Sequence, residues 1–360
     1  MGMWVEVFES QPNFLCTKIG NKKKGKNNMK SSGIGGQAVI EGIMMKNQEQ
    51  YAVAVRKPDQ EIAIDIKNYQ GIVKNKMVRN FPIVRGVLSF IDSLVLGMKT
   101  LTFSASFYEE DENSKPSKAD QALNQLFKDK AEAVVMGATV CFSVVAAVAL
   151  FMILPYLISD FLAPYVISTK LMALIEGVIR ITIFIGYILL ISCMKDIRRT
   201  FMYHGAEHKC INCIESGLPL TIENVRVSSK QHRRCGTSFL LIVMIISMVF
   251  FFFIQTSSPV MRVVIRLLLI PVIAGVSYEF IRFAGNSDSV LVEWLSKPGM
   301  WMQKLTTKEP DDSMIEVAIQ AVEAVFDWKT WQVEQGYLSK EEADIMRAEE
   351  GFEFYETDDQ

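Results

Sequence analysis

The stretch AVVMGATVCFSVVAAVALFMILPYLI, residues 133–158, decides the fold class of this chain because it is long, apolar and free of charge. A helix needs about 20 apolar residues to cross the hydrocarbon core of a bilayer. SFLLIVMIISMVFFFFIQT, residues 238–256, is equally uncharged. A large buried core helix of a soluble protein is the alternative, but uncharged runs of this length favour membrane spans.

Two more segments, residues 171–193 and 263–281, are also apolar enough to span a bilayer. We therefore predict a mainly α protein: a multi-pass helical membrane protein with about four transmembrane helices in contact with the lipid bilayer. Half of the residues are hydrophobic, the net charge is −2 and there are six cysteines. These values argue against a nucleic-acid partner and against a disulfide scaffold.

Basic residues set the expected orientation. They gather in the segment 194–237, whereas the loops 160–170 and 257–262 carry one basic residue each, Lys170 and Arg262. Because basic loops stay in the cytoplasm, we expect a cell-membrane protein whose two termini and 194–237 loop are cytoplasmic.

The rest of the chain divides by composition into parts outside the membrane. We predict a disordered basic leader at 1–32, a cytoplasmic β module plus an amphipathic helix at 33–107, a charged linker at 108–132, a transmembrane region at 133–284 and a cytoplasmic helical tail at 285–360. Short β-branched runs such as YAVAVRK and EIAIDIK are typical of a small antiparallel sheet. Residues 82–107 have apolar side chains at helical spacing together with Arg85, Asp92 and Lys99. An additional membrane helix here is the alternative to an amphipathic one.

The chemistry centres on YHGAEHKCINCIE, residues 203–215. In a helix His204 and His208 lie one turn apart on one face, with Glu207 beside them. H-x-x-E-H is the pattern of the inverted zincins, in which two imidazoles bind zinc and the glutamate takes a proton from water. A catalytic zinc needs another ligand and an open position. His232 and Cys235 of QHRRCG lie on the same loop, so we predict a divalent metal, zinc, at His204, His208, His232 and Cys235, with Glu207 as the catalytic base.

Other interpretations of this segment stay open. Cys210-x-x-Cys213 followed by His232-x-x-Cys235 has the spacing of a closed structural zinc knuckle, and a short H-x-x-E-H also occurs in loops that bind no metal. Two functions follow. One is a metal-dependent hydrolase at the cytoplasmic membrane surface, acting on a lipid-linked, membrane-bound or cytoplasmic substrate. The other is a non-enzymatic membrane scaffold or sensor with a structural Cys/His metal site.

Several motifs together resemble the YqhQ-like family of bacterial membrane proteins. They include GGQAVIEGIMM, RGVLSFIDSLVLGMKTL, YHGAEHKCINCIE, LTIENVR, HRRCGTSFL and PGMWMQKLTTKEPDDSMIEVAIQA, and the resemblance runs from about residue 35 to 326. It implies a metal-dependent enzyme whose reaction is not established. The motif positions of the family are His204, Glu207, His208 and Lys209, and then His232, Arg234, Cys235 and Gly236. The Cys210/Cys213 pair is not among them, so the resemblance favours the histidines as ligands.

Overall fold

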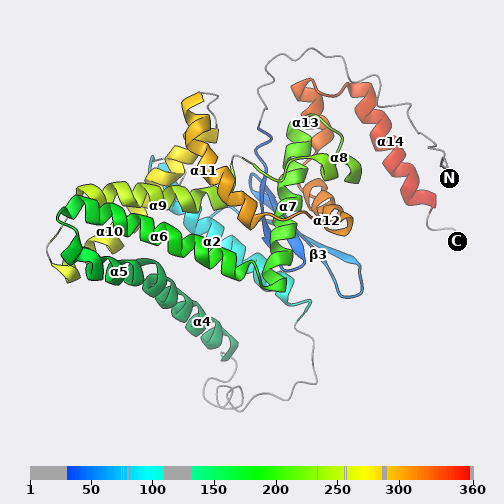
Figure 1. The fold of residues 1–360 in the computed structure, drawn as a ribbon. Coiled ribbons are helices and arrows are strands. Elements are labelled where there is room, and N and C mark those ends of the chain that lie inside the picture. The colour runs from blue at the N-terminus through cyan, green and yellow to red at the C-terminus, as the bar shows by residue number, and fades with distance from the viewer. Residues whose placement is uncertain are drawn as a thin grey trace, which may run out of the picture. The chain divides into compact units, whose positions relative to one another are not determined.

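The computed structural model describes residues 31–356, with gaps at 74, 76, 79–80, 109–130, 233, 255, 257 and 286–289. The described chain is mainly helical with one small antiparallel sheet, as the sequence predicts (Figure 1). The predicted leader at 1–32 and the predicted linker at 108–132 fall almost entirely outside the described residues.

The sheet is a four-stranded antiparallel meander. Its strands follow chain order: β1 (Gly35–Val39), β2 (Gly42–Asn47), β3 (Gln50–Arg56) and β4 (Ile62–Asn68). Two-residue turns join the first three strands, and Glu41 and Gln48 adopt positive φ angles of 48° and 52° in these turns. Tight hairpins need such backbone angles to match the twist of the strands.

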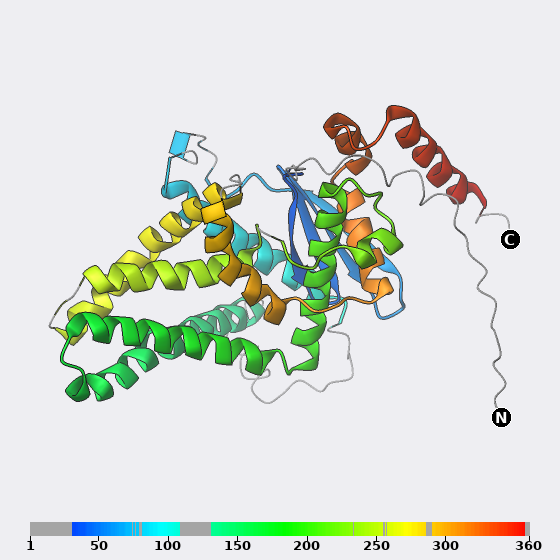
Figure 2. The same ribbon diagram turned by 45° about the horizontal axis from the view of Figure 1, so that its top comes forward.

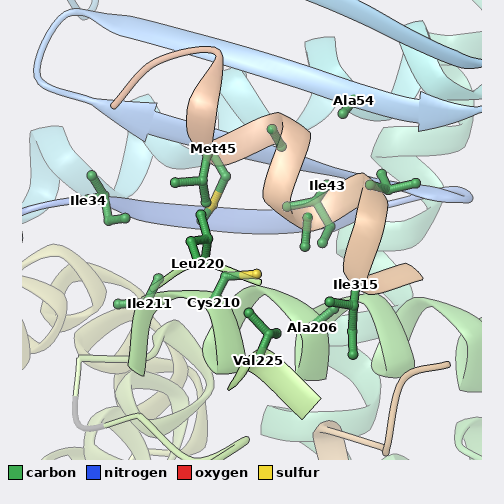
Figure 3. Packing of buried hydrophobic residues seen from close by; sticks show 14 of the residues in the cluster. Ile34, Ile43, Met45, Ala54, Ala206, Cys210, Ile211, Leu220, Val225 and Ile315 are labelled. Atoms are coloured by element: carbon green, nitrogen blue, oxygen red, sulfur yellow. The ribbon is translucent and has the colours of Figure 1, made fainter. Parts of the chain in front are cut away.

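Helices cover both faces of the sheet because side chains alternate along each strand. Ile43, Met45, Ala52 and Ala54 face a core that they share with helix α7 (Lys195–Glu215) and helix α12 (Asp312–Glu323) (Figure 3). The alternate residues, among them Val39, Met44, Val53 and Val55, face helix α2 (Val84–Ala105). In Figure 2, α2 (cyan) and the pair α7 and α12 (green and orange) lie on opposite sides of the sheet.

The remaining helical elements follow in chain order. They are α4 (Ala131–Val148), η2 (Ala149–Ile153), α5 (Leu154–Leu162), η3 (Ala163–Tyr165), α6 (Thr169–Ile191), α8 (Ile222–Val227), α9 (Gly236–Phe253), α10 (Pro259–Gly285), α11 (Val290–Thr306), α13 (Trp328–Gln335) and α14 (Lys340–Glu356). The predicted loop 194–237 is therefore largely helical. Its helix α7 joins the sheet and α12 in one core, so segments predicted as separate parts fold together.

Five helices are long and apolar enough to cross a membrane: Val84–Ala105, Gly137–Tyr165, Thr169–Ile191, Gly236–Phe253 and Val263–Phe283. The last four coincide with the predicted spans. Their side chains are mostly exposed, since only 6% to 28% of the most apolar 18-residue stretch of each helix is buried. Exposed apolar surface of this extent is not tolerated in water. These helices indicate a multi-pass membrane protein and argue against buried core helices.

The first of these five helices, α2, differs from the other four because it packs on the sheet. Leu96 is buried against the sheet, with Phe103 packed alongside. Asp92 accepts a hydrogen bond from Tyr69 Oη (3.0 Å), and Arg85 pairs with Glu279 of α10. The charged residues that distinguish this segment thus have partners in neighbouring elements. The amphipathic helix predicted here and the alternative of an additional membrane helix both stay predictions.

Removing side-chain volume from the shared core is expected to destabilise the fold. Ile43 is fully buried between the sheet and α7, so Ile43→Ala should cost about 2–5 kcal/mol through lost apolar burial and a residual cavity. Ile66 of β4 is 53% exposed, and Ile66→Ala should change stability by less than about 1 kcal/mol. Thermal unfolding of the two detergent-solubilised variants measures the difference. Equal effects would contradict this description of the core.

Candidate metal centre

Helix α7 carries a polar stripe on the face away from the sheet. His204, His208, Asn212 and Glu215 recur at helical spacing, whereas Tyr203, Ala206, Cys210 and Ile214 face the apolar core. The helix follows α6 after a short connection. The stripe therefore begins midway along α7, nine positions after its first residue, Lys195.

The structure brings three predicted ligands together. One nitrogen of His204, one nitrogen of His208 and Sγ of Cys235 all lie within 4.8 Å of one another. Cys235 Sγ is 3.3 Å from His204 Nε2. His208 and Cys235 are buried, and His204 is partly exposed. Cys235 reaches the group as the N-cap residue of α9, where its Sγ accepts the backbone N–H of Thr237.

Backbone carbonyls fix the orientation of both imidazoles. His204 Nδ1 lies 3.0 Å from the carbonyl oxygen of Thr306, and His208 Nδ1 lies 2.8 Å from that of Lys230. A carbonyl oxygen can only accept, so each Nδ1 carries the proton and donates it. Each Nε2 then keeps a free lone pair. Metal-binding histidines are commonly oriented in this way.

Two buried side chains hold the loop that provides the carbonyl for His208. Lys209 Nζ donates to the carbonyls of Arg226 (2.7 Å) and Ser228 (3.0 Å), and it pairs with Glu309 at 2.6 Å. Asn212 Nδ2 donates to the carbonyls of Ser229 and Gln231. The loop is thus anchored to α7 on both sides of Lys230.

Gly205 allows a second backbone segment to pass close to α7. A Cβ at this position would lie 2.1 Å from the carbonyl oxygen of Lys308, and Lys308 N–H donates to the Phe201 carbonyl (2.8 Å). This contact fixes the end of α11, where the carbonyl oxygen of Thr306 accepts a hydrogen bond from His204 Nδ1.

Replacing Gly205 with alanine is therefore expected to weaken metal binding without removing a ligand. The added methyl group must push the Lys308 backbone away and misplace the Thr306 carbonyl, and loss of such outer partners lowers metal affinity by about 10–100-fold. Gly186→Ala in α6 is the matched control, because nothing lies within 4 Å of its Cβ position. Metal titration of both variants checks the prediction. Unchanged metal affinity in Gly205→Ala would show that the backbone from Thr306 to Lys308 does not orient His204.

His232 lies beside the three-residue group but is engaged elsewhere. Its ring centroid is 5.9 Å from that of His208, and its Nε2 is 3.4 Å from Glu215 Oε2. Gln303 holds the backbone of His232 at both ends, accepting from its N–H and donating to its carbonyl, each at 2.8 Å. His232 as a metal ligand stays a prediction.

Glu215 is a buried anion that the sequence motifs did not single out. It accepts hydrogen bonds from the backbone N–H and hydroxyl of Ser32 (2.7 and 2.8 Å) and pairs with Arg234 and His232. Burial alone raises the pKa of its carboxyl, but these partners hold that pKa at about 2. Burial lowers the pKa of His232. The spacing of His208, Asn212 and Glu215 on one helical face is the sequence signal that could have revealed this anion.

Glu207, the predicted base, is buried between α7 and the sheet. Its Oε1 accepts the backbone N–H of Gly36 at 3.1 Å, and its Oε2 makes no hydrogen bond among the described residues. Burial raises the pKa of this carboxyl, while the neighbouring His204 and the Gly36 N–H oppose the shift. A buried carboxylate oxygen without a partner is unusual, and it marks a site where a further polar group or ligand fits.

The described residues do not assemble the alternative structural knuckle. Cys210 and Cys213 are fully buried in the apolar core, and Figure 3 shows Cys210 pointing from α7 toward the sheet. Burial raises the pKa of both thiols, that of Cys213 to about 12. Zinc binds thiolates. The two cysteines therefore fit a packing role rather than a site shared with His232 and Cys235.

The site residues lie inside the region that matches known proteins. Residues 81–328 match the family model described as "Protein of unknown function (DUF1385)". The chain is also 34% identical over 290 residues to "Uncharacterized protein YqhQ" of Bacillus subtilis (strain 168), covering 80% of this chain and 90% of that protein. No solved structure matches the chain. These similarities confirm the resemblance inferred from the motifs: the chain belongs to the YqhQ-like family of proteins of unknown function.

Proposed function

We propose that this protein is a metal-dependent membrane enzyme, a hydrolase whose divalent metal is bound by His204, His208 and Cys235. The observation that carries the proposal is the convergence of three donor atoms within 4.8 Å, with both imidazoles held by backbone carbonyls. The alternative of a non-enzymatic scaffold or sensor with a structural metal is distinguished by the hydrolysis experiment below.

The donor set fits zinc. Two imidazole nitrogens and one cysteine sulfur are ligands that zinc prefers, and three protein ligands with one open position are typical of catalytic rather than structural zinc sites. A bound zinc ion would supply Lewis-acid charge that activates water. His232 lies outside the group of three and its Nε2 contacts Glu215, so we assign it to the surrounding hydrogen-bond network.

Glu207 is proposed as the base. It follows His204 by three residues on α7, and its Oε2 has no hydrogen-bond partner among the described residues. The Gly36 N–H holds the other oxygen, so the carboxyl group is anchored at Oε1. Oε2 would accept the proton of the attacking water and pass it to the leaving group, as expected for general acid–base catalysis.

The fold supports a site at the cytoplasmic membrane surface. Cys235 lies at the start of α9, and His204 and His208 lie midway along α7, the helix that follows α6. The apolar helices α6 and α9 pack together. We propose that four spans cross the cell membrane, formed by α4 with α5, then α6, α9 and α10. Helix α2 would cover the sheet at the membrane surface. An even number of spans leaves the sheet and both termini on one side, and the basic residues of 194–237 favour the cytoplasm for that side.

An apolar cavity on helices that also contribute to the metal centre favours a lipid-linked substrate. A cavity of about 490 Å³ lies between α9, α10 and α11, with Trp294, Trp301 and Lys297 in its lining. Helix α11 also provides Gln303 and the Thr306 carbonyl to the metal centre. Tryptophan and lysine are typical of the interface between lipid tails and headgroups. We therefore propose that an acyl chain lies in this cavity while the polar bond of the substrate reaches the metal centre.

Hydrolysis by the reconstituted protein tests the proposal. A panel of lipid-linked esters, amides and phosphoesters should contain a substrate whose cleavage requires metal and falls at least about 100-fold in Glu207→Gln. That variant should retain its metal, because Glu207 is not one of the three clustered ligands. Hydrolysis that persists in metal-free protein would refute the enzyme assignment, and metal-dependent stability without hydrolysis of any panel member would favour the scaffold.

A further inference from the structure

A second buried polar cluster lies within the apolar helices, remote from the metal centre. Glu176 and Arg180 of α6 and Arg266 of α10 are only 5%, 7% and 7% exposed. Glu176 lies 15 positions before the end of α6 (191 − 176), which corresponds to about 22 Å of helix. The cluster is therefore near the opposite end of α6 from α7.

The cluster has two cations and one anion. Glu176 Oε1 lies 3.0 Å from Arg180 Nη2 and 2.5 Å from Arg266 Nη1, and its Oε2 accepts from Arg266 Nη2 at 2.7 Å. The guanidinium carbons of Arg180 and Arg266 lie 5.1 and 4.9 Å from the centroid of the Phe251 ring. One positive charge is left without a carboxylate within the cluster, which is costly at membrane depth.

Hydrogen-bonding capacity is also left over. Each guanidinium group carries five N–H donors. Arg180 uses one on Glu176 and one on Ser247 Oγ, at 3.4 Å, and its buried Nε has no partner among the described residues. A structural ion pair alone would satisfy these donors more fully.

A cavity opens beside this cluster. Its volume is about 370 Å³, and Arg266, Glu176 and Phe251 contribute to its lining together with Ser159, Thr169 and Asp160. Asp160 is exposed and makes none of the described ion pairs. The cavity thus presents a surplus cation and a separate carboxylate, together with neutral hydroxyl groups.

We propose that this cavity binds a phosphate ester that carries an amine, such as a phosphoethanolamine group. The phosphate takes the surplus positive charge through the donors that remain on Arg266, the guanidinium group in the cavity lining, for which phosphate has matching geometry. The amine pairs with Asp160. The group comes either from a membrane lipid or from a soluble ester, and the site is independent of the proposed metal chemistry.

Native mass spectrometry of the purified protein tests this assignment. The probes are phosphatidylethanolamine, phosphatidic acid, phosphatidylcholine and soluble glycerophosphoethanolamine. Phosphatidylethanolamine is expected to be retained at least tenfold better than phosphatidylcholine, whose trimethylated amine cannot donate hydrogen bonds to Asp160. Retention of the soluble ester as well would support the site and assign a soluble source, whereas retention of the lipid alone would support it and assign a membrane source.

Three variants probe separate parts of the site. Arg266→Gln should lower retention about tenfold, and Asp160→Asn should abolish the preference for phosphatidylethanolamine over phosphatidylcholine. Ala173→Phe fills the cavity without changing any charge and should block binding of phosphatidylethanolamine and of glycerophosphoethanolamine. Each variant must show the same thermal unfolding midpoint as the wild type in the absence of ligand, which shows that the fold is intact. Equal retention of all probes by the wild type, or retention unaffected by Ala173→Phe, would overturn the proposal.

Discussion

His208→Ala is expected to strip the metal from the purified protein. His208 is 1% exposed and its Nδ1 is fixed by the Lys230 carbonyl, so neither water nor a neighbouring side chain can take its place readily. Loss of one ligand of three should exceed the roughly 10–100-fold cost of losing an outer partner. Elemental analysis after purification should show about one metal ion per wild-type chain and almost none in the variant.

Two matched variants make this experiment decisive. His232→Ala removes the histidine that faces Glu215, and the three-ligand site predicts that metal stays bound. Cys213→Ala removes a buried core thiol and should also leave the metal in place. Loss of metal from His232→Ala would restore the four-ligand set predicted from sequence. Loss from Cys213→Ala combined with retention in His208→Ala would favour the structural knuckle instead.

Acid is expected to destabilise the protein through Glu215. The folded state holds the pKa of this carboxyl at about 2, compared with an ordinary value of 4.5. A lowered pKa means that the contribution is fully present above about pH 4.5 and is lost as the pH falls toward 2. Its full value is about 3 kcal/mol. Thermal unfolding of the solubilised protein between pH 6 and pH 3 should therefore show a falling midpoint.

Glu215→Gln isolates this contribution. The substitution leaves Arg234 and the buried His232 without their anion, and breaking a buried pair on one side costs about 3–5 kcal/mol. The destabilisation should be largest at neutral pH and should shrink as the pH approaches 3. Glu61→Gln is the control, since Glu61 forms an exposed pair with Lys57 that contributes little. A constant difference between wild type and Glu215→Gln across this pH range would contradict the assignment.

The sequence predicts those parts of the molecule that depend on local pattern. Residues 133–158 and 238–256 reveal candidate spans because an uncharged apolar run of this length is typical of a membrane helix. The spacing of His204 and His208 reveals one face of α7. A small antiparallel sheet is likewise evident from short β-branched runs separated by turns, although the number of strands is not.

What the sequence does not show depends on segments that meet only in the folded chain. Cys235 joins the two histidines, while the adjacent His232 turns to Glu215, because Gln303 of a distant helix fixes the loop backbone. The carbonyl of Thr306 carries no sequence signature at all. Residues 82–107 are similarly ambiguous, since their apolar periodicity suits both a membrane span and a helix that covers a sheet.

The shared core of the sheet, α7 and α12 has a consequence for biogenesis. Asn47 in β2 donates a hydrogen bond to the carbonyl of Val325, 278 positions later in the chain. Translation delivers the strands first and α12 near the end, after every apolar helix has been made. The face of the sheet that packs against α7 and α12 therefore stays incompletely covered until the last apolar helix has been made. During that interval the apolar side chains of this face are exposed, and surfaces of this kind are prone to aggregation.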